Sequence, residues 1–453
     1  MQHKSNQIDM TNGNVFLKLT AFSIPLIFSS VLQLLFNAAD VVVVGRYAGE
    51  EALAAVGSTG SLINLLVNLF LGLSIGANVV AARYFGAGKK DRVSDTVHTS
   101  IIMSVFSGLF LTFTGVFLSR QILIWMQSPE DVLELSALYL RIYFAGIIPT
   151  VVYNFGSALL RAKGDTKRPL YYLFAAGILN VLLNLFFVIV CSMSVAGVAL
   201  ATVISQTLAA FLVIICLIRE KDEFHLDIKK LKPDYGIMRQ IIKIGLPAGF
   251  QGIVFSLSNV IIQSSVNSFG KITVAGNSAA SNIEGFVYIS MNGFSQGTLT
   301  FVSQNMGKQD FDRIKKVTLV SLATVFATGL IFGNTVAFLG KYLVGFYNSK
   351  PDVIREGVIR LNVICTTYAL CGIMDVMGSV VRGMGHSMKP MAVSMLGACG
   401  SRILWIATVF QIPEYHSCFV VFLSYPVSWF ITFVVHLLVF FHVYKTERQK
   451  SLS

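Results

Sequence analysis

Charged residues are scarce in this chain of 453 residues. Only 13% are Asp, Glu, Lys or Arg, about half of the roughly 25% that is usual in soluble proteins, whereas 54% are hydrophobic. A soluble chain of this length could not keep so much apolar surface away from water. The composition therefore excludes soluble domains, disorder and collagen-like repeats, and it indicates a protein whose solvent is the lipid bilayer.

Motifs for metal binding and nucleotide hydrolysis are also missing. The six cysteines lie in apolar segments without CxxC or Cys/His spacing, which predicts free thiols rather than a metal site or a disulfide framework. Neither GxxxxGK[ST] nor HExxH occurs. The single Gly164-Asp165 pair stands in a predicted loop, where an intramembrane aspartyl protease would not place it. We therefore expect neither an enzyme nor a chain with its own ATP site, and no cofactor.

Long apolar segments, in contrast, follow one another along the whole chain. A helix needs about 20 apolar residues to cross the hydrocarbon. Twelve stretches satisfy this condition: 19–44, 52–82, 93–119, 133–160, 170–190, 195–218, 244–270, 272–306, 317–340, 353–381, 390–412 and 416–444. The sequence predicts an all-α integral membrane protein with 12 transmembrane helices. One charged segment, residues 219–243, separates the sixth span from the seventh.

The 35 Lys and Arg residues are distributed unevenly between the loops. Most lie at the two termini and in every second loop, on the side that includes segment 219–243. The loops of the opposite side carry few of them, namely Arg46, Arg120, Lys271, Lys341, Lys350 and Arg355. By the positive-inside rule, both termini are expected in the cytoplasm. The net charge of +12 thus reflects membrane topology, and no nucleic-acid partner is expected.

The two halves of the chain resemble each other at a constant spacing. RAKGDTKRP, which begins at Arg161, matches RGMGHSMKP, which begins at Arg382, in the Arg, in the Gly at the fourth position and in the Pro. Further landmarks recur at the same spacing: Gly76, Gly86, Asp91 and Arg92 correspond to Gly297, Gly307, Asp312 and Arg313. We expect an N-lobe at 1–220, a cytoplasmic linker at 221–238 and a C-lobe at 239–453. Six spans per half predict two six-helix lobes related by a pseudo-two-fold axis along the membrane normal.

Several segments resemble the MATE (multidrug and toxic compound extrusion) family. The stretch from Pro25 to Gly57 is similar to the family's opening helix pair, with its early Pro, Asp40, Gly45 and the ALAAVG run. FVSQNMGKQDFDR at 301–313 and the two Arg…Gly…Pro loops are similar as well. The resemblance covers essentially the whole chain. It implies a V-shaped pair of lobes, functional as a monomer, that exports cationic or amphipathic organic compounds in exchange for protons or sodium.

The resemblance also implies a cation site in the N-lobe. Asp40 would belong to this site together with Asn180 and Thr202. Asn184 departs from the family pattern, in which a carboxylate is frequent at this position, and the seventh span lacks the Glu of some sodium-coupled members. From the residues alone, the i, i+4 amides Asn180 and Asn184 could be interhelical hydrogen-bonding groups or ligands of a hard cation. The coupling ion stays open between H⁺ and Na⁺, and Na⁺ at Asp40 is the one metal considered.

Charges inside the spans point to function independently of the resemblance. Each costs about 2.5–3.5 kcal/mol at a helix centre on insertion scales, so a compensating role is expected. The prominent ones are three acids and one base: Asp40, Glu284, Asp375 and Arg402. Their excess of negative charge calls for a bound cation or a proton, as coupling requires. Two alternatives stay open: Asp40 could be a solvated acid near the end of its span, and Glu284 could pair with Arg402 in a structural salt bridge.

The sequence therefore predicts a cation-coupled antiporter that exports cationic or amphipathic compounds by alternating access. Short loops and the lack of extra domains favour a bacterial cytoplasmic membrane, with small organic molecules and membrane lipids as partners. The coupling cation is assigned to Asp40, Asn180, Asn184 and Thr202. Candidates for C-lobe coupling or substrate binding are Glu284, Asp375, Arg402 and Asn154, the last being the repeat counterpart of Asp375. The alternative is a lipid-linked oligosaccharide flippase, which would need a cationic cavity for a pyrophosphate head group.

Overall fold

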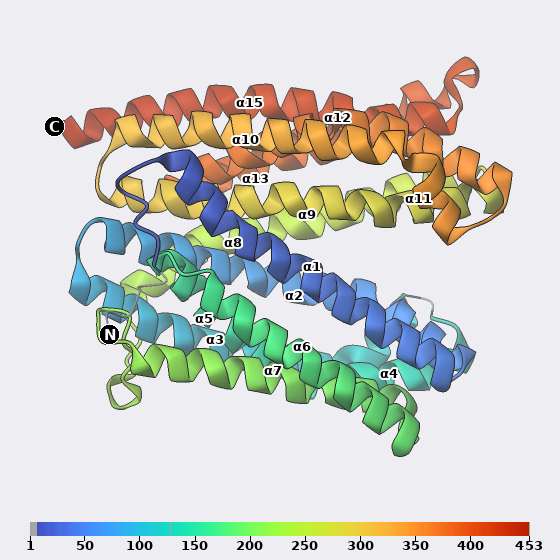
Figure 1. The fold of residues 1–453 in the computed structure, drawn as a ribbon, viewed down its shortest axis with the longest axis horizontal. Coiled ribbons are helices and arrows are strands. Elements are labelled where there is room, and N and C mark those ends of the chain that lie inside the picture. The colour runs from blue at the N-terminus through green and yellow to red at the C-terminus, as the bar shows by residue number, and fades with distance from the viewer. Residues whose placement is uncertain (1–6, 127, 453) are drawn as a thin grey trace. The chain divides into compact units, whose positions relative to one another are not determined.

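The computed structural model describes residues 7–126 and 128–452. This part of the chain consists of α-helices, two π-helical turns and three short 3-10 turns, without a β-strand (Figure 1). The all-α fold class predicted from the sequence is confirmed.

The described residues of the first half supply seven helices and one π-helical turn. The pair α4–α5 is bent by 49° at Gly146, and the π-helical turn η1 extends α6 without a break. The bounds are α1 Val15–Tyr47, α2 Glu50–Gly86, α3 Lys90–Trp125, α4 Glu130–Ala145, α5 Ile147–Lys163, α6 Lys167–Leu185, η1 Phe186–Val190 and α7 Ser194–Arg219.

The second half begins after a short 3-10 turn, η2 Ile228–Lys230, in the charged segment. Here the second π-helical turn, η3, joins two short helices into one span. The bounds are α8 Tyr235–Asn267, α9 Lys271–Gly307, α10 Phe311–Phe338, α11 Gly340–Tyr347, α12 Pro351–Gly383, α13 Met388–Ser394, η3 Met395–Gly400, α14 Ser401–Ala407, η4 Val409–Gln411, η5 Pro413–Tyr415 and α15 Cys418–Leu452.

Every predicted span lies on a helix of the structure. Within residues 7–126 and 128–452, ten helices are long and apolar enough to cross a membrane, and the bent pair α4–α5 raises the number of candidate spans to eleven. The remaining predicted span, 272–306, is α9, which at 37 residues is long enough but carries polar residues such as Asn277, Glu284 and Gln296. The 12-helix arrangement expected from the sequence is therefore present.

The helices form two compact units, and each unit combines two separate stretches of the chain. Unit 1 contains residues 1–8 and 28–249, and unit 2 contains residues 9–27 and 250–453. The boundaries fall inside two helices, after Ile27 of α1 and after Gly249 of α8. Each boundary lies two residues after a proline inside the helix, Pro25 in α1 and Pro247 in α8. The lobes 1–220 and 239–453, defined by the repeat, stay a prediction.

Close glycine packing holds each of these half-helices in its unit. In unit 1, a Cβ atom on Gly72 of α2 would lie 2.3 Å from the backbone nitrogen of Gly249 in α8. In unit 2, a Cβ atom on Gly293 of α9 would lie 2.4 Å from Cγ1 of Ile27 in α1. Only glycine permits such an approach. Because Gly72 and Gly293 are related by the repeat spacing, the two units use equivalent glycines for equivalent contacts.

Candidate functional site

The approach of α1 to α6 in unit 1 determines where Asp40 lies. A Cβ atom on Gly177 of α6 would lie 1.7 Å from Cε2 of Phe36, so the ring occupies the space that any larger residue would need. Asp40 follows Phe36 by four residues and Asn184 follows Gly177 by seven, which places both on the next turns of the same contacting faces. The two side chains therefore meet, and Asn184 Nδ2 donates a hydrogen bond to Asp40 Oδ1.

A chain of hydrogen bonds links all four residues that were predicted to form the cation site. Asn184 Nδ2 also donates to Asn180 Oδ1 at 3.3 Å, and Asn180 Nδ2 donates to Thr202 Oγ1 at 3.4 Å. The Thr202 hydroxyl is itself a donor to the carbonyl oxygen of Val198 at 3.0 Å. Three helices, α1, α6 and α7, thus contribute to one polar cluster. The structure brings the four side chains together, and their role in cation binding stays a prediction.

Acceptor atoms in this cluster outnumber donors. The Oδ1 atom of Asn184, a residue with 0% exposure, is buried and has no hydrogen-bonding partner. Asp40 receives its one described side-chain hydrogen bond from Asn184, and no basic side chain in the described part of the chain forms an ion pair with it. A carboxylate beside an unfilled amide oxygen suits a proton or a small hard cation, which prefers oxygen ligands.

Two tyrosines of α4 adjoin this cluster and were not found by sequence reasoning. Tyr139, which is 7% exposed, interacts electrostatically with Asp40. Its ring stacks on that of Tyr143, with the ring centroids 6.3 Å apart. Their i, i+4 spacing on one helix face was the available signal, but it does not show which neighbouring helix that face meets. Tyr139 thus links the Asp40 cluster to an aromatic pair on α4.

Glu284 of unit 2 has a very different environment from Asp40. Arg360 of α12 binds it through two nitrogens, with Nε 3.1 Å from Oε2 and Nη2 2.5 Å from Oε1. The remaining nitrogen of Arg360, Nη1, donates to Asn277 Oδ1 at 2.7 Å. The ring of Phe422 covers the guanidinium group, 5.3 Å from its centroid. Glu284 and Arg360 are thus a buried, bidentate ion pair with its hydrogen bonds satisfied.

The alternative in which Glu284 pairs with Arg402 is wrong. α9 and α12 lie side by side, which presents Glu284 to Arg360, whereas α14 faces α15. Arg402 instead donates from Nε to Ser428 Oγ at 2.8 Å and lies over the ring of Tyr425, 4.2 Å from its centroid. The excess of acids inferred from four buried charges is wrong for unit 2 as well, because it left out Arg360.

The other two candidates occupy separate units. Asp375 of α12 interacts with Tyr288 and with the guanidinium groups of Arg382 and Arg402. Asn154 of α5 donates from Nδ2 to the carbonyl oxygen of Thr150 in its own helix at 2.8 Å. Equivalent functional roles for Asp375 and Asn154 therefore stay a prediction.

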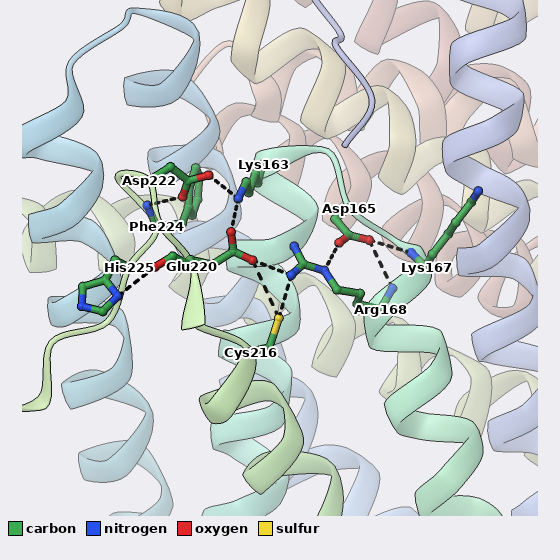
Figure 2. A network of polar contacts seen from close by, with 9 residues as sticks. All are labelled: Lys163, Asp165, Lys167, Arg168, Cys216, Glu220, Asp222, Phe224 and His225. Atoms are coloured by element: carbon green, nitrogen blue, oxygen red, sulfur yellow. Dashed lines mark hydrogen bonds and ion pairs between the residues drawn. The ribbon is translucent and has the colours of Figure 1, made fainter. Parts of the chain in front are cut away.

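The ion-pair network of Figure 2 joins the α5–α6 connection to the end of α7, and sequence reasoning missed it. Lys163 pairs with Glu220 and Asp222, and Arg168 pairs with Asp165 and with Glu220. Three of these side chains are almost completely buried: Lys163, Asp165 and Glu220. The segment predicted to be a cytoplasmic linker thus packs against unit 1, because its residues Phe224 and Leu226 are also buried.

Neither metal ligands nor disulfides form a site in this structure. No group of three or more His, Cys, Asp and Glu side chains that could hold a metal ion occurs within 7–126 and 128–452. All six cysteines are free, and five of them are buried.

The fold and the repeated half-helices define a helical membrane protein built from two related units. Its sequence matches the MatE family twice, over residues 25–186 and again over 247–407, once in each half. The chain belongs to the MatE family. The double match also confirms the internal repeat that was inferred from the spacing of Arg, Gly and Pro.

Named bacterial proteins and a solved structure are similar to this protein over most of its length. It is 28% identical over 390 residues to "Probable multidrug resistance protein YpnP" of Bacillus subtilis, covering 86% of this chain and 87% of the relative. It is 22% identical to "Multidrug export protein MepA" of Staphylococcus aureus, with 86% and 87% covered. A solved structure described as the outward-facing conformation of a multidrug resistance MATE family transporter has a TM-score of 0.91 at 19% identity, covering 99% of this chain and all of the other.

Proposed function

We propose that this protein is a cation-coupled antiporter that exports cationic or amphipathic organic compounds. The observation that carries the proposal is the Asp40 cluster. There, a carboxylate without a basic partner among the described residues lies beside the orphaned Oδ1 atom of Asn184. Membership of the MatE family and the names of the bacterial relatives support export of several compounds.

A cation at this cluster would act on three helices at once. Binding a proton or Na⁺ at Asp40 neutralises the carboxylate, which then no longer attracts a second positive group. It also ties together α1, α6 and α7 through Asn180, Asn184 and Thr202. An organic cation binding elsewhere in the protein would favour the state in which Asp40 is empty and charged. Export then follows from the different affinities of the two states for the cation and the compound.

The remaining expectations form part of the same proposal. We place the protein in a bacterial cytoplasmic membrane with both termini in the cytoplasm, where the basic loops would face. We expect it to work as a monomer, without a cofactor and without catalysing a chemical reaction. The names of the relatives do not favour the flippase alternative.

Transport in proteoliposomes tests the proposal. Purified protein is reconstituted, a proton gradient or a sodium gradient is imposed, and movement of ethidium is followed by its fluorescence. We expect one of the two gradients to drive ethidium transport. The variant Asp40→Asn keeps the shape of the side chain and one acceptor oxygen for Asn184 Nδ2. It carries no charge that could hold a proton or a cation, so transport should fall to the level of empty liposomes.

The matched control is Asp131→Asn, which makes the same chemical change at an exposed position in the first turn of α4. This variant should transport at the wild-type rate. Gradient-driven transport that persists in Asp40→Asn would contradict the assignment of the cation site. Absence of transport under both gradients, in wild-type protein shown to be folded, would contradict the function itself.

A further inference from the structure

Arg402 of unit 2 is buried, and most hydrogen-bond donors of its guanidinium group have no acceptor among the described residues. The residue is 3% exposed and follows the π-helical turn η3 by two residues. Its guanidinium lies over the ring of Tyr425 at 4.2 Å and near that of Trp429 at 5.7 Å. A guanidinium that stacks by its face keeps its edge, with the paired Nη donors, available for an acceptor.

The donors of Arg402 are largely unfilled. A guanidinium group has five N–H donors, and the one recorded hydrogen bond runs from Nε to Ser428 Oγ. No carboxylate of the described residues forms an ion pair with Arg402, whereas Arg360 in the same unit binds both oxygens of Glu284. A buried cation without an anion is costly inside a membrane protein, and such residues are usually functional.

Arg382 independently indicates a shortage of acceptors in the same unit. Its Nη2 donates to Gln251 Oε1 at 2.7 Å, but its Nε atom is buried and has no partner. Asp375 interacts electrostatically with both Arg382 and Arg402. Its single negative charge can neutralise only one of these two guanidinium groups. Since the Glu284–Arg360 pair is neutral, the three charges Asp375, Arg382 and Arg402 sum to one positive charge.

From these observations we infer that Arg402 is a binding site for an acidic group, a carboxylate or a phosphate, of an amphipathic compound. The acid binds the free edge of the guanidinium in a bidentate manner. The adjoining apolar part of the compound packs against the half-buried ring of Tyr425, which meets Trp429 edge to face. The inference rests on the proposed function and assigns Arg402 as the group that binds the acidic part of a transported compound.

A matched pair of dyes tests this site without any gradient. Rhodamine 110 carries a free carboxylate, and rhodamine 123 is its methyl ester with the same aromatic cation. Binding of each dye to the purified full-length protein in neutral detergent is measured by fluorescence polarisation. We expect Arg402→Gln to weaken rhodamine 110 binding about tenfold or more, as the loss of a hydrogen-bonded charge pair predicts. Binding of rhodamine 123 should change less than about twofold.

Two further variants keep the test decisive. Arg402→Lys retains the charge and removes the planar edge, so it should give an intermediate loss for rhodamine 110 even where Arg402→Gln fails to fold. Arg355→Gln, at a side chain of unit 2 that is 69% exposed, should bind both dyes like the wild type. Equal losses for acid and ester, or unchanged rhodamine 110 binding in folded Arg402→Gln and Arg402→Lys, would overturn the inference. Because no ion gradient is involved, failure here is distinguishable from failure of cation coupling.

Competition distinguishes the two sources of such an acid. Farnesyl pyrophosphate represents a lipid-linked phosphate, and a fluoroquinolone zwitterion represents a free compound. Displacement of rhodamine 110 by the zwitterion alone supports a small-molecule substrate. Displacement by farnesyl pyrophosphate in the wild type, lost in Arg402→Gln, assigns the same site to a lipid head group. Displacement by neither would overturn a site for acidic groups.

Discussion

The two units treat their buried carboxylates in opposite ways. In unit 1, Asp40 is held by an amide, and its neighbour Asn184 keeps an oxygen without a partner. In unit 2, Glu284 is bound by two nitrogens of Arg360, whose third nitrogen is taken by Asn277. A carboxylate that is fully neutralised can hold helices together but has nothing left to exchange. The contrast teaches that Asp40, which has no basic partner among the described residues, is a better candidate for cation coupling than Glu284, although unit 2 has the buried ion pair.

The largest expected effect is on the stability of unit 2. Glu284→Gln leaves Arg360, whose side chain is 6% exposed, as a buried cation without an anion. Breaking a buried pair in this way costs about 3–5 kcal/mol of unfolding free energy. We expect a sharp fall in the thermal midpoint in detergent. In the double variant Glu284→Leu with Arg360→Met, most of the stability should return, and a double variant as unstable as the single one would show that the pair does more than neutralise itself.

A smaller effect is expected at the ion-pair network of unit 1. Lys163 corresponds in the repeat to Met384, which is 1% exposed, so the same loop position is a buried cation in one unit and an apolar residue in the other. Lys163→Met removes a partner of Glu220 and Asp222 but leaves Arg168 bound to Glu220. We expect a loss of about 1–3 kcal/mol.

The control for this variant is Lys167→Met, at the first residue of the next helix, α6. Lys167 is exposed, and in Figure 2 its ammonium group extends away from the cluster. Thermal unfolding of this variant should match the wild type within error. Equal losses for both lysines would mean that charge in the loop, rather than the buried network, stabilises unit 1.

The third prediction sharpens the comparison at the proposed cation site. Asn184→Asp places a second carboxylate beside Asp40 without supplying a base. Two adjacent acids bind a cation more strongly than one, so we expect the affinity for the coupling cation to rise by about tenfold, the equivalent of one modest charge interaction. The concentration of H⁺ or Na⁺ that half-activates ethidium transport measures it. A value unchanged from the wild type would mean that residue 184 does not face the cation.

The smallest expected effect concerns His386, which corresponds in the repeat to the buried Asp165 of unit 1. Burial lowers the pKa of His386 below its usual value near 6.5, although the hydrogen bond to Glu447 at 3.2 Å acts in the opposite direction. The folded protein therefore binds this proton less readily than the unfolded chain does. The contribution of His386 to the free energy of unfolding is fully present above about pH 6.5 and is lost as the pH falls through the lowered pKa.

Thermal midpoints measured between pH 7.5 and pH 5 test this prediction. His386→Asn should flatten the decrease on the acid side without changing the midpoint at pH 7.5. A midpoint that rises as the wild-type protein is acidified would instead show that the charged His386–Glu447 pair is the more stable form.

Some of these features follow from the sequence, and others require the structure. Apolar length predicts the spans because each must cover the hydrocarbon, and the i, i+4 spacing correctly places Asn180 and Asn184 on one face. The partner of Glu284 could not be predicted, because it depends on how α9 and α12 are rotated about their axes. The bounds of the two compact units were equally inaccessible, since α1 and α8 are continuous helices whose sequences do not show that each is divided between units.

Release of the coupling cation on substrate binding tests the central claim most directly. Rhodamine 123 is added to weakly buffered, purified protein in detergent, while a pH-sensitive dye and a sodium electrode record the ions released. The account predicts release of about one cation per wild-type protein, and no release from Asp40→Asn even at dye concentrations that saturate it. The same release from Asp40→Asn as from the wild type would contradict a coupling site at Asp40.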